Sequence, residues 1–134
     1  MVDGGGGVGG LHHVEIYVAD LPLARDFWPW WLGELGWAPF QDWVEGFSWR
    51  RGDCYLVFVQ APLLDPPFHR RRPGLNHLAF HADSRAQVDL LAARVQERGW
   101  RLLYPERHPH AGGPQCNALF FEGPERLKVE LVAP

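Results

Sequence analysis

Two histidines stand at matching places in two similar stretches of this 134-residue sequence. The stretch GLHHVEIYVAD begins at Gly10 and GLNHLAFHAD begins at Gly74, so His13 and His77 align without gaps. Imidazole nitrogens bind divalent cations such as Zn²⁺, Mn²⁺, Fe²⁺ and Ni²⁺. A metal site that takes one histidine from each copy would explain why the histidine occurs twice.

The alternation of side chains along an extended strand predicts which residues share a face with these histidines. In the first stretch apolar residues alternate with His13, Glu15 and Tyr17, and in the second they alternate with His77 and His81. We expect the apolar sets to face a helix. The polar sets are then expected to face a cleft.

The last predicted strand, 126–132, adds a carboxylate to the same face, because its apolar residues alternate with Lys128 and Glu130. Two imidazoles and a carboxylate in one cleft are costly to bury unless something pairs with them, and a divalent cation would do so. Three protein ligands leave coordination positions for water and substrate, as in catalytic metal sites. We therefore predict a metal site formed by His13, His77 and Glu130.

Each histidine-bearing strand is followed by a predicted helix. Asp20 is a suitable N-cap for a segment with helical spacing that ends at Gly36. Ser84 and Gln87 form a capping-box pattern before a second such segment, which ends at Gly99. These signals place one helix after each copy of the repeated stretch.

Three strand-like segments follow each predicted helix, so each half is one βαβββ unit. Pro29 lies inside the first helical segment and should bend or interrupt it. The six strand segments are 38–43, 46–50, 54–60, 101–104, 116–122 and 126–132. The predicted fold class is α+β, with a flexible glycine-rich tail at 1–9 and a single domain at 10–134 built from module 1 (10–62), a linker (63–73) and module 2 (74–134).

Composition limits the partners of the chain. The formal net charge of −3 gives no overall attraction to nucleic acid, and the run from Arg70 to Arg72 is expected to be a solvated loop. No apolar run reaches the length of a membrane span, and no export signal precedes the first strand, so we expect a cytoplasmic protein. Seven tryptophans and eight phenylalanines are compatible with a cavity for a small-molecule substrate.

The three motifs together resemble the vicinal oxygen chelate superfamily, which contains glyoxalase I, fosfomycin and bleomycin resistance proteins, methylmalonyl-CoA epimerase and extradiol dioxygenases. The resemblance rests on GLHHVEIYV, GLNHLAFHA and the terminal FFEGPERLKVELVAP, and it covers the chain from about residue 10 onward. It implies paired βαβββ modules around a U-shaped mixed-sheet cleft. It also implies a divalent metal held by His13, His77 and Glu130. The chain is further expected to form a homodimer, and in some members of the superfamily the two chains of the dimer exchange modules.

The same resemblance implies a fourth ligand position in glyoxalase-like members, at the end of module 1. Aligning VFVQAP with VELVAP places Phe58 opposite Glu130. Because phenylalanine cannot bind a metal, a lactoylglutathione lyase becomes less favoured. Gln60, two residues further on, could partly substitute if the alignment slips.

Several other residues are candidates for catalysis or substrate contact. Glu15 could carry a proton or be a rim carboxylate paired with Lys128 or an arginine. His108 and His110 precede two glycines, which is typical of a mobile lid bearing an acid or base, although plain loop histidines fit equally well. The predicted substrate pocket consists of Phe58, Gln60, His81, Trp49 and Tyr104. His81 could equally lie at the rim of the cleft. The three aromatic residues could equally belong to the core.

These observations favour a metal-dependent enzyme that chelates a small oxygen-bearing substrate, with the ion as Lewis acid and Glu130, Glu15 and His110 as candidate catalytic groups. The reaction could be of lyase, isomerase, transferase or dioxygenase type. The alternative is a metal-free protein, similar to bleomycin resistance proteins, that sequesters an aromatic or drug-like ligand. In that case the two histidines and Glu130 are hydrogen-bonded residues of the pocket.

Overall fold

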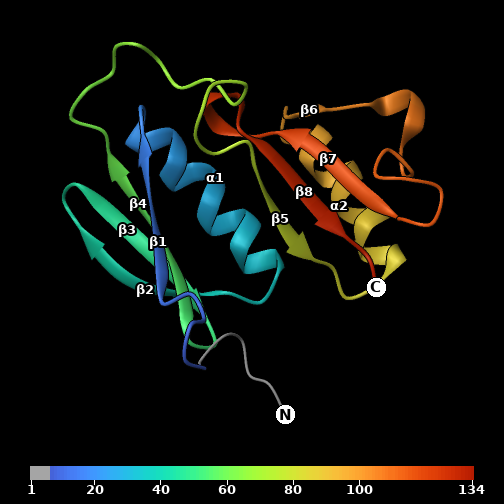
Figure 1. The fold of residues 1–134 in the computed structure, drawn as a ribbon, viewed down its shortest axis with the longest axis horizontal. Helices are drawn as coiled ribbons and strands as arrows, with labels where there is room; N and C mark the ends of the chain where they lie inside the picture. The colour runs from blue at the N-terminus through green and yellow to red at the C-terminus, as the bar shows by residue number, and fades with distance from the viewer. Residues whose placement is uncertain (1–6) are drawn as a thin grey trace. The chain divides into compact units, whose positions relative to one another are not determined.

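The computed structural model describes residues 7–134 and divides the chain into two compact units. Unit 1 ends at Pro67 and unit 2 runs from Phe68 to Pro134, so the boundary falls inside the predicted linker. Most of the expected glycine-rich tail, residues 1–6, lies outside the described residues. Each unit contains one sheet and one long helix (Figure 1).

Unit 1 is built on a four-stranded sheet with the order β1-β4-β3-β2. Strand β1 runs parallel to β4, and the other neighbours are antiparallel. The helix α1 packs against β2, β3 and β4 and covers one face of this sheet (Figure 1). The elements are β1 (His13–Val18), α1 (Leu21–Glu34), β2 (Ala38–Trp43), β3 (Gly46–Arg51) and β4 (Cys54–Gln60).

Unit 2 repeats this topology with the order β5-β8-β7-β6, again with the first pair parallel. Its helix α2 packs against β6 and β7 (Figure 1). The elements are β5 (His77–His81), α2 (Arg85–Glu97), β6 (Arg101–Leu102), the 3-10 helix η1 (Pro105–Arg107), β7 (Ala118–Glu122), the 3-10 helix η2 (Pro124–Arg126) and β8 (Lys128–Val132). The predicted α+β fold with two βαβββ modules is confirmed.

Both helices begin at the predicted capping residues. The Oδ1 atom of Asp20 accepts a hydrogen bond from the Leu23 N–H at 3.0 Å. The Ser84 Oγ atom accepts from the Gln87 N–H at 3.1 Å, and Gln87 Oε1 accepts in return from the Asp83 N–H at 2.8 Å. These bonds satisfy amide groups that have no partner within the helix.

Of the two effects expected of Pro29, a bend or an interruption, the interruption does not occur, because α1 continues to Glu34. The aromatic residues on both sides of the proline explain this. Phe27, Trp28 and Trp31 are at most 2% exposed, and burial of each side chain contributes about 2–3 kcal/mol. The sum exceeds the cost of about 3 kcal/mol for a proline inside a helix.

Among residues 7–134, no helix is long and apolar enough to cross a membrane.

Burial alternates along the strands as expected for sheets covered on one face. In β8, Val129 and Leu131 are fully buried, whereas Lys128 and Glu130 are half-buried. In β1, His13, Glu15 and Tyr17 are exposed, and the apolar residues between them are half-buried or buried. The predicted polar residues of β1 and β8 therefore lie on the helix-free faces of their sheets.

Candidate metal centre

His77 and Glu130 meet on the helix-free face of unit 2. The parallel pairing of β5 with β8 aligns His77 with Lys128 and Ala79 with Glu130, so His77 and Glu130 are diagonal neighbours. The His77 Nε2 atom lies 3.2 Å from the Glu130 Oε1 atom. The Glu130 side chain is only 14% exposed and that of His77 34%. Two of the three predicted ligands are thus adjacent in the folded unit.

Asn76 orients the His77 ring. Its Nδ2 atom donates to the Arg70 carbonyl at 3.1 Å, and because a carbonyl only accepts, this contact fixes which end of the amide is nitrogen. The Asn76 Oδ1 atom then faces His77 Nδ1 at 2.7 Å and can only accept from it. The proton of the neutral imidazole therefore sits on Nδ1, and Nε2 presents its lone pair toward Glu130.

An imidazole lone pair facing a carboxylate oxygen is unfavourable unless a cation or a second proton lies between them. A ring nitrogen held through its other N–H, with a carboxylate beside it, is the usual arrangement of metal-binding histidines. The donor set of His77 and Glu130 therefore fits a divalent cation. Among the described residues of unit 2, no third His, Cys, Asp or Glu joins this pair.

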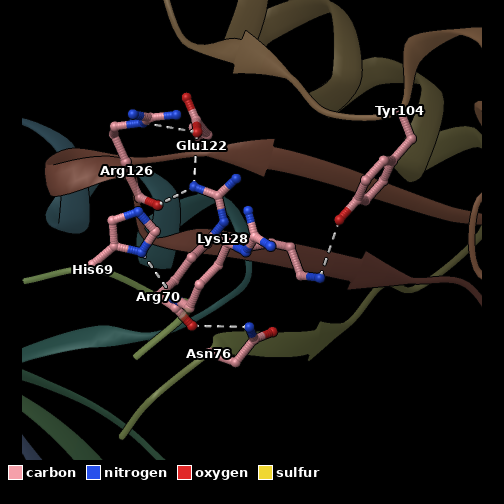
Figure 2. Close-up of polar contacts among 8 residues, drawn as sticks. His69, Arg70, Asn76, Tyr104, Glu122, Arg126 and Lys128 are labelled. Atoms are coloured by element: carbon pink, nitrogen blue, oxygen red, sulfur yellow. Dashed lines mark hydrogen bonds and ion pairs between the residues drawn. The ribbon is translucent and has the colours of Figure 1, made fainter. Parts of the chain in front are cut away.

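An ion-pair network around the buried Glu122 supports the backbone that holds Asn76. Arg70 Nη1 donates to Glu122 Oε2 and to the Arg126 carbonyl, both at 2.7 Å, and Arg126 Nε donates to the same carboxylate oxygen at 3.2 Å (Figure 2). Burial alone would raise the pKa of Glu122, but the hydrogen bonds and charges of the two arginines lower it below its ordinary value. Glu122, Arg70 and Asn76 thus form a connected support for His77.

The prediction that Arg70–Arg72 is a solvated loop is wrong for Arg70. The Arg70 side chain is only 18% exposed, because Glu122 is buried and needs a counter-charge. Arg71 and Arg72 are exposed, as expected for a surface loop.

In unit 1, His13 lies on the helix-free face of β1. Its ring stacks on Tyr55 with centroids 4.8 Å apart and an interplanar angle of 7°. Its Nδ1 atom lies 2.9 Å from His12 Nδ1, so one of the two nitrogens donates to the other. His12 is the sequence counterpart of Asn76, and in both units the preceding residue contacts Nδ1 of the repeated histidine.

The strand register corrects the predicted counterpart of Glu130. Glu15 pairs with Val57 in unit 1, and the equivalent Ala79 pairs with Glu130 in unit 2. Val57, rather than Phe58, therefore occupies the position of Glu130. A slip of one residue reverses the face of a strand, which explains the error.

Phe58 accordingly lies on the helix-facing side of β4, where it is fully buried and stacks on Trp28 at 4.8 Å. Its predicted place in a substrate pocket on the opposite face is wrong. Gln60 is bound at the helix start instead, since its Oε1 accepts from the Leu21 N–H at 3.1 Å and its Nε2 donates to the Ala19 carbonyl at 2.9 Å.

Trp49 also belongs to the helix side of its sheet. It pairs in register with Leu56, and a β-carbon added at Gly33 of α1 would lie 3.6 Å from its ring. It lines a surface hollow of about 380 Å³ on that side, together with Arg25 and Asp42. The prediction that Trp49 lines the substrate pocket on the helix-free face is therefore wrong.

The remaining predicted residues lie on helix-free faces or in loops. Glu15 and His81 are exposed. His110 Nδ1 donates to the Cys116 carbonyl at 3.0 Å, which leaves Nε2 as the nitrogen that can accept a proton. His108 is half-buried directly after η1.

Tyr104 lies over the helix-free face of unit 2. Its ring packs edge-on against Phe120, with centroids 5.5 Å apart. Its hydroxyl accepts a hydrogen bond from Lys128 Nζ (Figure 2), with 3.3 Å between the two atoms. Tyr104 has a left-handed backbone (φ 53°), which ends the predicted 101–104 strand early at Leu102.

Sequence reasoning gave little weight to Asn76, Arg70 and Lys128. Asn76 could have been noticed because it immediately precedes a repeated histidine. Lys128 could have been noticed because it is the sole lysine beside twelve arginines. Arg70 had no local signal, since its partner Glu122 is 52 residues away.

Comparison with known proteins identifies the family. The chain matches the Glyoxalase/Bleomycin resistance protein/Dioxygenase superfamily over residues 12–120 and therefore belongs to it. It is 53% identical to the Bacillus subtilis protein YqjT over 126 residues, which are 92% of this chain and 98% of that protein. A crystal structure from Bacillus halodurans is 55% identical, with a TM-score of 0.93 and coverage of 94% of this chain and 96% of that one.

More distant structures share the fold alone. The fosfomycin resistance protein FosX from Listeria monocytogenes is 20% identical, with a TM-score of 0.67 over 94% of this chain and 91% of that one. A lactoylglutathione lyase from Agrobacterium tumefaciens is 18% identical, with a TM-score of 0.64 over 93% of each chain. The fold is thus shared by proteins of different activity, and the site residues must decide the function.

Proposed function

We propose that this chain is a metal-dependent enzyme that binds one divalent cation through His13, His77 and Glu130 and acts on a small oxygen-bearing molecule. The observation that carries the proposal is the approach of His77 Nε2 to Glu130 Oε1 at 3.2 Å, with Nδ1 held by Asn76. The third ligand of the proposal, His13, would come from the equivalent strand of the other module. Its Nδ1 also has a contact with the residue before it.

The ligand set suits Zn²⁺, Mn²⁺, Fe²⁺ or Ni²⁺, because it combines imidazole nitrogens with one carboxylate. When bound, the ion would act as a Lewis acid on a substrate oxygen. Glu130 would contribute negative charge from a largely buried position, which strengthens its attraction to the ion. Asn76 would keep the His77 lone pair directed at the same place.

Two residues remain candidates for moving protons. Glu15 lies two positions from His13 on the same exposed face of β1, where it could take a proton from a substrate. His110 has its Nδ1–H engaged with the Cys116 carbonyl, so its Nε2 could receive or return a proton. Both remain predictions of this proposal.

The register favours a three-ligand site over the four-ligand site of glyoxalase-like members. Val57 stands where a second carboxylate would be needed, and its side chain cannot bind a metal. Gln60 could not substitute without breaking its bonds to Leu21 and Ala19. This register makes a lactoylglutathione lyase less favoured.

The test is elemental analysis of protein purified without chelator and without a nickel column. Wild type should carry about one divalent ion per chain, and His77→Ala and Glu130→Ala should lose it. His81→Ala is the matched control, since His81 lies on the same face of β5 and should retain the metal.

The opposite result would support the metal-free alternative. If wild type is empty and does not take up zinc, manganese, iron or nickel on reconstitution, His77 and Glu130 are lining residues of a pocket. The protein would then be examined as one that sequesters a small aromatic ligand. A homodimer, which the family resemblance implies, is a separate prediction that sedimentation can check.

A further inference from the structure

Lys128 is the sole lysine of the chain, which otherwise uses arginine for its positive side chains. It lies on the helix-free face of unit 2, on the same strand as Glu130. In register it stands between His77 on β5 and Glu122 on β7. Its β-carbon is about 6–7 Å from that of Glu130, because the two residues are two positions apart on one strand. The proposed metal position and the ammonium group therefore border the same patch of the sheet.

Within the described part of the chain, residues 7–134, the ammonium group of Lys128 has one hydrogen-bond partner. It faces the Tyr104 hydroxyl (Figure 2), and the two atoms are 3.3 Å apart. It also lies 5.6 Å from the ring centres of both Tyr104 and Phe120. Among residues 7–134 it forms no ion pair with a carboxylate. An ammonium group has three donors, so two donors of this half-buried group have no acceptor among the described residues.

The neighbouring acidic groups are already engaged. Glu122 bonds to Arg70 and Arg126, and Glu130 faces His77. Among the described residues, Lys128 therefore has no carboxylate in direct contact. A partly desolvated positive charge next to a metal position attracts a negatively charged oxygen.

Lysine suits this task better than the arginine found elsewhere in the chain. The ammonium group is a compact point charge with rotatable donors, whereas guanidinium is a wide planar fork. A compact donor can reach one oxygen of a small molecule whose other oxygens lie at the metal. The Tyr104 hydroxyl, held beside it, can donate to the same oxygen.

We propose that Lys128 Nζ and Tyr104 Oη form a binding site for an anionic substrate oxygen, which makes small carboxylates with an adjacent oxygen the substrate class of this enzyme. The inference rests on the proposed function for the placement of the second oxygen at the metal. The ammonium–hydroxyl pair itself is contained in unit 2 and does not depend on the metal.

The first experiment uses oxalate as the probe and reductive methylation of the wild-type protein as the readout. Since Lys128 and the N-terminal amine are the only primary amines, mass spectrometry can follow each separately. Oxalate should slow methylation of Lys128 and leave that of the N-terminus unchanged, in both chelator-treated and metal-loaded protein. Equal rates with and without oxalate would overturn the inference, whatever the metal content.

The second experiment measures oxalate binding to the metal-loaded protein by calorimetry. Lys128→Met should weaken binding about 10- to 100-fold, and Tyr104→Phe about 2- to 10-fold. Lys128→Arg should recover part of the loss because it restores charge but not shape. Elemental analysis of each variant keeps the two proposals apart, since the metal content should not change. Unaltered affinity in Lys128→Met would show that the lysine only packs on its aromatic neighbours.

Discussion

The Nε2 atom of His77 lies 3.2 Å from the Oε1 atom of Glu130, across the parallel strands β5 and β8. The same two positions in unit 1 hold His13 and Val57. Both units therefore carry the histidine, but only unit 2 carries the carboxylate. Tyr55, which stacks on His13, occupies the position that Lys128 holds in unit 2. The two helix-free faces are thus alike in backbone and different in chemistry.

Removing the amide that orients His77 should weaken metal binding without changing the ligands. Asn76→Ala leaves the Nδ1 proton without its acceptor, so the ring can rotate away from Glu130. We expect the metal affinity to fall about 10- to 100-fold in competition with a colorimetric chelator. Asn117→Ala, at an asparagine just before β7 in the same unit, is the control and should bind metal as wild type does. An unchanged affinity in Asn76→Ala would mean that the ring is held by other contacts.

The buried Glu122 should make stability depend on pH. Its pKa is lowered in the folded protein, so its ion pairs stabilise the fold above the unfolded value of about 4.3 and lose that contribution as pH falls through the folded value. At pH 7, Glu122→Gln should lower the free energy of unfolding by about 1–3 kcal/mol. The difference from wild type should shrink in urea titrations below about pH 4.

A surface ion pair provides the comparison for Glu122. Asp42 pairs with Arg25 at 2.9 Å, but its side chain is 75% exposed. Asp42→Asn should cost less than about 1 kcal/mol, with little dependence on pH. If Glu122→Gln behaved like Asp42→Asn, the network around Arg70 would not stabilise the fold.

Phe58 should matter for stability and not for metal binding. It is fully buried between Trp28 and Phe47, so Phe58→Ala should lower the free energy of unfolding by about 3–5 kcal/mol, measured by denaturant titration. Tyr17→Ala, at a residue that is 60% exposed, should change it by less than about 1 kcal/mol. The metal content of folded Phe58→Ala should equal that of wild type. If Phe58→Ala folded but lost the metal, Phe58 would contribute to the metal site.

Much of the fold was predictable because it depends on local patterns. The capping residues Asp20 and Ser84, the alternation in β1 and β8, and the repeat itself are visible in neighbouring residues. That α1 continues through Pro29 was not predictable, since the cost of a proline is local whereas the burial that offsets it comes from the sheet.

The sequence by itself determined the two βαβββ modules and the residue types that could hold an ion, because strand period and helix capping act over a few residues. Only the tertiary structure decided which of these side chains meet. The pairing of β5 with β8 brings Glu130 to His77, and the pairing of β1 with β4 sets Val57 in the equivalent place and turns Phe58 inward. Register depends on hydrogen bonds between strands far apart in the chain, and a shift of one residue reverses every face.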